Sequence, residues 1–116
     1  MAATLAEANV RIDGTTAVID LSGDINRLAE TVINEAYDQA KAAGCTELIL
    51  NFAGTEFINS TGIAVIVGML AKARQEGRSV SACGLTEHYQ HIFQITRLSD
   101  FMPMFPDEMS ARAKAS

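Results

Sequence analysis

The sequence predicts an α/β fold: a four- to five-stranded mixed sheet, mostly parallel with an antiparallel N-terminal hairpin, with three to four helices packed on it. Apolar runs of strand length alternate along the chain with longer segments in which apolar residues recur at helical spacing. The dipeptide Asp13-Gly14 stands between the first two apolar runs and is typical of a hairpin turn, so these strands are expected to be antiparallel. Strands joined by helices pair in parallel through right-handed crossovers, which predicts the rest of the sheet.

The strands are expected at residues 6–12, 16–21, 48–52, 79–84 and 102–105. In the second strand, alternation places one set of side chains on one face of the sheet (Ala17, Ile19, Leu21) and a second set on the other (Val18, Asp20). The third strand is almost continuously apolar, as expected of a strand covered on both faces.

Three polar segments follow the parallel strands, at residues 22–26, 53–60 and 84–86. We expect them to be loops. The carboxyl ends of parallel strands meet at one edge of a sheet, and open α/β folds usually bind ligands or partners there.

The helices are predicted from their start and stop signals. Asn26 can cap a first helix that ends near residue 43, before Gly44. A second helix is expected from Thr61 to about residue 75, and Thr86 can cap a third. A short helical tail is expected from Asp107.

Length and composition narrow the class of protein. The chain has 116 residues with no repeat and no Pro- or Gly-rich linker, so one domain over residues 1–116 is expected. Hydrophobic residues make up 48%, enough for a core without metals or disulfides. The net charge of −5 and the scattered Lys and Arg argue against a nucleic-acid or anionic-membrane partner. The longest apolar run, residues 63–71, is too short to span a membrane.

Cysteine, histidine and motif patterns predict a non-catalytic protein. Cys45 and Cys83 lack CxxC spacing and no signal peptide is recognised, which favours buried thiols in a reducing cytoplasm. His88 and His91 have a spacing that can hold a metal. Only Glu87 stands near them, so a solvated helix face and no metal site are expected. No nucleophile elbow, P-loop or GxGxxG occurs, so we expect no enzyme activity and no cofactor.

The segment 57–65 is the most informative part of the chain, because small polar residues and a glycine stand there at a predicted helix start. Ser60 or Asn59 can accept the unpaired amide hydrogens of the first turn. Gly62 allows another group to approach the backbone closely. Taken alone, these residues are also compatible with a plain helix cap after a tight turn.

Residues 48–62 resemble the signature of the STAS domain, the family of bacterial anti-sigma factor antagonists. In that family a strand and a polar loop lead to an Asp-Ser-Ser-Gly or Asp-Ser-Thr-Gly turn followed by a helix. Here the turn reads Asn59-Ser60-Thr61-Gly62. The resemblance covers about residues 5–106 and includes the segments 21–24, 77–80 and 92–98.

The resemblance implies a STAS-like fold and a protein-binding function switched at Ser60. In the family, the first serine of the turn is phosphorylated by a serine/threonine protein kinase that is itself the anti-sigma factor. The unmodified domain binds this kinase and frees the sigma factor, and phosphorylation releases the domain. The residues expected to contact the partner are Asp24, Asn26, Asn59, Ser60, Thr61 and Gly62. A cytoplasmic monomer or weak dimer is expected.

Two positions depart from the family pattern. Asn59 and Asn26 stand where the family usually has Asp, so two carboxylates beside the hydroxyl of Ser60 are missing, although Asp24 lies nearby in sequence. These departures suit an alternative, a STAS accessory subunit of a lipid-transport ATPase or larger signalling complex that needs no phosphorylation. A small-ligand pocket at the same edge is a third possibility, without a visible phosphate-binding loop.

Overall fold

The computed structural model describes residues 4–115. Five strands form one sheet: β1 (Glu7–Asp13), β2 (Thr16–Ile25), β3 (Glu47–Ile58), β4 (Ser79–Cys83) and β5 (Met104–Phe105). The helices are α1 (Glu30–Ala42), α2 (Ser60–Gln75), α3 (Glu87–Ile95) and α4 (Glu108–Ala115), with short 3-10 helices η1 (Arg27–Ala29) and η2 (Leu98–Asp100).

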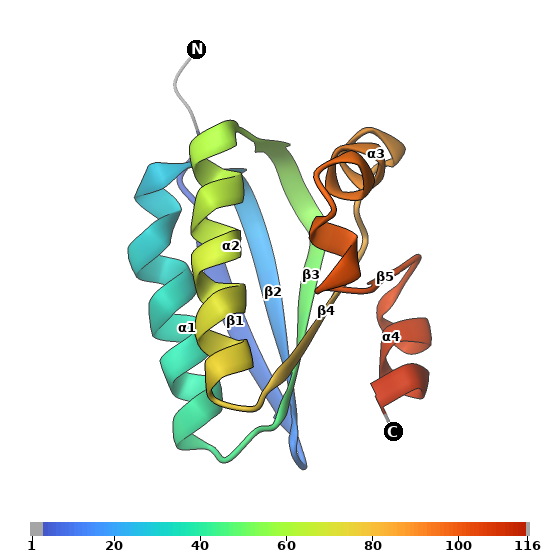
Figure 1. The fold of residues 1–116 in the computed structure, drawn as a ribbon. Helices are drawn as coiled ribbons and strands as arrows, with labels where there is room; N and C mark the ends of the chain where they lie inside the picture. Colours follow the sequence, from blue (N-terminus) through green and yellow to red (C-terminus); the bar gives the residue numbers. More distant parts are fainter. Residues whose placement is uncertain (1–3, 116) are drawn as a thin grey trace.

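The sheet confirms the predicted mixed topology. Its strand order is β1-β2-β3-β4-β5; β1 and β2 pair antiparallel, and every later neighbouring pair is parallel. Helices α1 and α2 lie side by side against one face of the sheet, and α4 lies on the other side near β4 and β5 (Figure 1). The hairpin at Asp13-Gly14 is present as expected, with Asp13 paired to Thr16.

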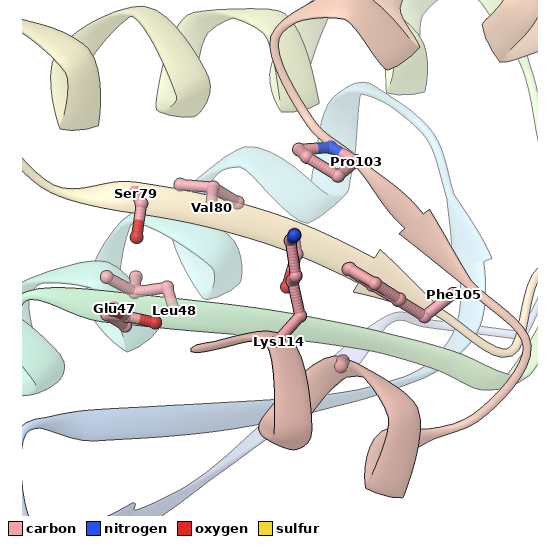
Figure 2. Close-up of a pocket in the computed structure, with 9 residues that line it drawn as sticks. Glu47, Leu48, Ser79, Val80, Pro103, Phe105 and Lys114 are labelled. Carbon is pink, nitrogen blue, oxygen red and sulfur yellow. The ribbon is translucent and has the colours of Figure 1, made fainter. Parts of the chain in front are cut away.

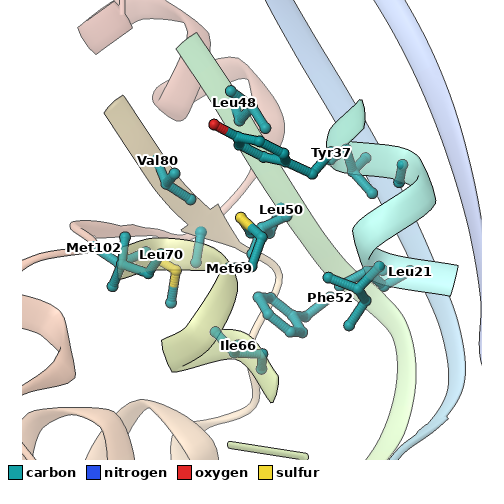
Figure 3. Packing of buried hydrophobic residues seen from close by; sticks show 14 of the residues in the cluster. Leu21, Tyr37, Leu48, Leu50, Phe52, Ile66, Met69, Leu70, Val80 and Met102 are labelled. Carbon is teal, nitrogen blue, oxygen red and sulfur yellow. The ribbon is translucent and has the colours of Figure 1, made fainter. Parts of the chain in front are cut away.

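The main core lies between the sheet and the α1–α2 layer. Side chains from the sheet, such as Leu48, Leu50 and Phe52, meet Tyr37 of α1 and Ile66 of α2 (Figure 3). The alternation predicted for β2 is confirmed, because its odd-numbered apolar residues Ala17, Ile19 and Leu21 join this core. The fold therefore buries a continuous apolar layer on one face of the sheet.

The opposite face carries a second, smaller apolar cluster beneath α4. Val18, Ile49 and Cys83 from three strands pack there with Ala111 of α4. A cavity of about 210 Å³ remains beside this cluster, and its lining includes Lys114 of α4 together with residues of β3, β4 and β5 (Figure 2).

Two predicted loops are wrong. Residues 22–25 continue β2, and residues 53–58 continue β3, so both strands reach the carboxyl edge of the sheet. The polar residues there pair with each other, Ser22 with Gly54 and Gly23 with Thr55, across register shifts in β2. Gly23 has φ +80°, and a Cβ at this position would lie 2.3 Å from the carbonyl oxygen of Leu5. The glycine and polar residues, which suggested a loop, therefore form an irregular continuation of the ladder.

Side-chain exposure confirms the predictions made for the two cysteines and the two histidines. Cys45 and Cys83 are buried free thiols, and His88 and His91 are both exposed on α3. Within residues 4–115, no helix is long and apolar enough to cross a membrane. The same residues contain no cluster of three or more His, Cys, Asp or Glu that could hold a metal ion.

Candidate functional site

The carboxyl ends of β2 and β3 bring the predicted site residues to one edge of the sheet. The two strands run in parallel to their last residues, where Asp24 pairs with Phe57 and Ile25 with Ile58. One residue, Asn26, separates β2 from η1, and one residue, Asn59, separates β3 from α2. The amide of Asn59 donates to the carbonyl oxygen of Ile25 at 3.2 Å, which ties the start of α2 to the end of β2. We call this region the Ser60 edge; it comprises residues 24–28 and 57–62.

Asn59, not Ser60, caps α2. Its Oδ1 atom accepts from the amide of Gly62 at 2.8 Å and from the hydroxyl of Thr61 at 2.8 Å. Its backbone is extended (φ −93°, ψ −179°), as expected of an N-cap residue. An amide oxygen is a sufficient acceptor for this role, which explains physically how Asn replaces the family's Asp here without loss of the cap.

Ser60 is the first residue of α2 and is exposed to solvent. Within residues 4–115, no hydrogen bond is recorded from its hydroxyl, so the oxygen is available to another molecule. The first turn of α2 contains no acidic residue. The positive end of the helix dipole therefore faces this hydroxyl without a neutralising side chain from that turn.

Gly62 lies in the buried layer beneath this surface. A Cβ at this position would stand 1.9 Å from the carbonyl oxygen of Ile25 and 3.2 Å from the amide nitrogen of Asn26. Only a residue without a side chain allows α2 to start so close to the end of β2. Gly62 was expected to contact a partner, but packing within the domain is enough to explain why this position requires a glycine.

Asn26 and Asp24 make local hydrogen bonds rather than contacts with Ser60. The Oδ1 atom of Asn26 accepts from the amide of Leu28 at 2.9 Å and caps η1. The carboxylate of Asp24 accepts from the amide of Thr4 at 3.2 Å, and the amide of Asp24 donates to the carbonyl of Thr4 at 2.9 Å. Asp24 therefore reaches the Ser60 edge, but the contacts recorded for its carboxylate lie with the N-terminal segment.

Sequence reasoning missed two large apolar side chains at this edge. Phe57 is 53% exposed and Leu28 is 65% exposed, although each stands next to a buried residue in sequence. Phe57 alternates with the buried Ile58 in β3, so a period-2 analysis extended to residue 58 would have placed it on the outside. Aromatic side chains are enriched in protein interfaces, so Phe57 is a candidate contact residue at this edge.

Comparison with known proteins adds independent information. A family model described as "Mlab, STAS domain" matches residues 8–105. The anti-sigma F factor antagonist of Paenibacillus polymyxa is 22% identical over 95 residues, covering 81% of this chain and 81% of that protein. The anti-sigma-B factor antagonist of Staphylococcus aureus is 22% identical over 98 residues, covering 81% of this chain and 91% of that protein.

Solved structures share the fold. An anti-sigma factor antagonist from Mycobacterium paratuberculosis superposes with a TM-score of 0.79 at 17% identity, covering 95% of this chain and 93% of that one. The phosphorylated form of the Bacillus cell fate determinant SpoIIAA has a TM-score of 0.72 at 20% identity, covering 94% of this chain and 99% of that one. The family match covers most of the sheet and the whole Ser60 edge, and the topology agrees with it. This chain belongs to the STAS domain family.

Proposed function

We propose that this chain is an anti-sigma factor antagonist that binds a serine/threonine kinase, itself an anti-sigma factor, and that phosphorylation of Ser60 releases it. The observation that carries the proposal is the position of Ser60: an exposed hydroxyl at the first residue of α2, with the capping role taken by Asn59. The names of the two curated relatives support this class of function. In this proposal the chain acts by binding and supplies no catalytic group.

The proposed switch follows from the charge that phosphorylation adds. The kinase transfers the γ-phosphoryl group of ATP to the Oγ atom of Ser60: the new O–P bond forms, the bond to ADP breaks, and the hydroxyl proton leaves to a base of the kinase. The phosphate adds about −1.5 to −2 charges. It is tolerated within the domain because it sits at the positive end of α2. It is costly against a desolvated partner surface, because a charge without a counter-charge must lose its water there.

Phe57 and Leu28 would supply the apolar part of the proposed interface. Both belong to the Ser60 edge and are exposed: Leu28 lies in η1, and Phe57 is paired with Asp24 near the end of β3. Interface cores are enriched in aromatic side chains surrounded by a polar rim. A phosphate introduced into this arrangement would separate the apolar side chains from the partner.

The departures at Asn59 and Asn26 predict that the kinase must supply the carboxylate. Both amides act as caps here, and neither can accept the hydroxyl proton as a carboxylate would. In the proposed function, Asn59→Asp therefore keeps the cap and raises the rate of phosphorylation. The rate is measured as phosphate incorporation by intact mass spectrometry after addition of the cognate kinase and ATP.

The decisive experiment compares variants of Ser60 in binding to the cognate kinase by calorimetry. Ser60→Ala should bind as the unmodified protein does and resist phosphorylation. Ser60→Glu should fold normally but lose at least about tenfold in affinity, which corresponds to about 1.4 kcal/mol. Gln39→Glu is the matched control for the added charge and should bind as the wild type does, because Gln39 is exposed near the C-terminal end of α1, outside the Ser60 edge. Equal affinities for Ser60→Ala and Ser60→Glu would refute the switch.

A second candidate function is a STAS accessory subunit of a transporter or larger signalling complex that is not phosphorylated. It is favoured by the neutral residues Asn59 and Asn26, which lack the carboxylates expected beside a phosphorylated serine. Phosphate analysis of the protein isolated from its native cell separates the two. Phosphate on Ser60 supports the first function; unmodified protein that co-purifies with transporter subunits supports the second.

A further inference from the structure

Helix α4 covers a strip of apolar side chains on the face of the sheet opposite α1 and α2. Val18, Ile49 and Cys83 lie beneath it and are at most 1% exposed. Among the side chains described for α4, only Ala111 is fully buried, whereas Met109 is 80% exposed. Helix α4 therefore buries little apolar surface of its own, whereas the apolar side chains that it covers are almost completely buried.

Ion pairs join α4 to β1. Arg11 of β1 binds Asp20 of β2 (Nε–Oδ2 2.6 Å) and Glu108 of α4 (Nη2–Oε1 2.5 Å). Glu108 also accepts from Arg112 at 2.8 Å, and Arg112 reaches Asp13 at 3.1 Å. Arg11 thus links the sheet to the first turn of α4 through a single guanidinium group.

The groups in these ion pairs are charged at neutral pH, but dissolved salt can screen the attraction between them. Hydrogen bonds from Arg11 hold the pKa of Asp20 and that of Glu108 below their usual values, so both carboxyl groups are ionised. The side chains are nevertheless partly exposed, with 42% for Arg11 and 28% for Glu108. Pairs of this kind weaken as ionic strength rises.

The length of α4 couples its release to its unfolding. A helix of eight residues is not stable by itself in water, so α4 exists only while it is docked. The chain enters the helix at Pro106, and Asp107 caps it through the amide of Ser110 at 2.8 Å. Detachment therefore unfolds one short terminal segment and leaves the main core in place. Local openings of this kind require much less free energy than global unfolding.

We propose that α4 can detach from the sheet while the rest of the domain stays folded, and that the ion pairs of Arg11 hold it in place. Detachment brings Cys83 and the apolar strip around it into contact with solvent. Detachment of α4 does not involve the Ser60 edge, because α4 lies on the other side of the sheet from α2 (Figure 1). In the closed state Cys83 is inert: burial, together with the nearby carboxylates of Glu108 and Asp107, raises the pKa of its thiol to about 11.

Cys45 provides an internal reference for the test. It is fully buried in the main core, so it reacts only when that core opens. The full-length protein is treated with N-ethylmaleimide, and modification of each cysteine is followed by peptide mass spectrometry. We expect Cys83 to react at least about tenfold faster than Cys45. The ratio should increase between about 0.1 M and about 1 M NaCl, where the Debye length falls from about 10 Å to about 3 Å.

Arg11→Met tests whether the ion pairs of Arg11 hold α4 in place. Arg97→Met is the matched control, because Arg97 forms an exposed ion pair with Asp100 away from α4. Arg11→Met should accelerate Cys83 at low salt, remove most of the salt dependence and leave Cys45 unchanged. Equal rates for the two cysteines in the wild-type protein would overturn the proposal. So would a proportional acceleration of both in Arg11→Met, which means global destabilisation, or an Arg11→Met profile identical to that of Arg97→Met.

Discussion

Replacing each of two glycines of α2 by alanine should change stability in opposite directions. At Gly62 the new Cβ would lie 1.9 Å from the carbonyl oxygen of Ile25, whereas ordinary contacts begin at 3.4 Å. The start of α2 must therefore retreat by about 1.5 Å, the difference between these two distances. At Gly68 the same Cβ meets nothing within 4 Å. Comparing the two variants thus distinguishes the effect of close packing at the Ser60 edge from the effect of helix propensity.

The expected magnitudes follow from these contacts. Overpacking against backbone costs about 1–3 kcal/mol, occasionally more, and the retreat also strains the hydrogen bond from Asn59 to Ile25. Gly68→Ala should gain about 0.5–1 kcal/mol, because alanine is the better helix former in the interior of a helix. We expect Gly62→Ala to lose about 2 kcal/mol net, since it sits in the first turn, where the propensity gain is smaller.

Urea denaturation followed by circular dichroism measures both effects as shifts of the midpoint at constant slope. In thermal unfolding of a domain of this size, each kcal/mol corresponds to about 4 °C. If Gly62→Ala were as stable as the wild type, the close approach of α2 to Ile25 would be wrong. If Gly68→Ala were destabilised as well, the contrast would not arise from packing at the strand end.

Three further perturbations test other contacts. Asn59→Ala should lose about 1 kcal/mol through loss of the cap, while Asn59→Asp should retain stability or gain about 0.5 kcal/mol from the helix dipole; equal urea midpoints for the two variants would contradict this. Tyr89→Phe should cost about 1–3 kcal/mol, because the buried amide of Ile58 donates to the Tyr89 hydroxyl at 2.9 Å and would lose its acceptor. Finally, Arg11 lowers the pKa values of Asp20 and Glu108 in the folded state. Their contribution to the free energy of unfolding is therefore fully present above the usual carboxyl range near pH 4, and it is lost as the pH falls through the lowered values. Arg11→Met should flatten the pH dependence of the unfolding free energy in this acidic window, and an unchanged slope there would show that these pairs do not contribute.

Local signals in the sequence predicted the helices and the hairpin well. Thr86 caps α3 through the amide of Tyr89, as expected, and the turn at Asp13 is present. The boundaries of α2 differ by one residue from the expected start at Thr61. Caps and turns depend on hydrogen bonds between residues a few positions apart, so a short stretch of sequence carries the information.

The extensions of β2 and β3 could not be predicted in the same way. Gly23 and Gly54 are turn formers by composition, yet each is paired across the ladder. A strand continues where its neighbour offers backbone partners, and the neighbour here is a segment about thirty residues away in sequence. Asp24 lies near the missing carboxylates in sequence, but in the structure its carboxylate accepts a hydrogen bond from the amide of Thr4.

The amino-acid sequence alone determined the α/β class, the order of the elements, the family resemblance and the serine at the start of α2. Only the tertiary structure decided that Asn59 caps the helix, that the hydroxyl of Ser60 is exposed, and that Arg11 meets Glu108 across 97 positions of the chain. Periodicity and capping arise from neighbours within one or two turns. Exposure and long-range ion pairs arise from strand register and from how closely elements approach, and no single segment of the chain contains that information.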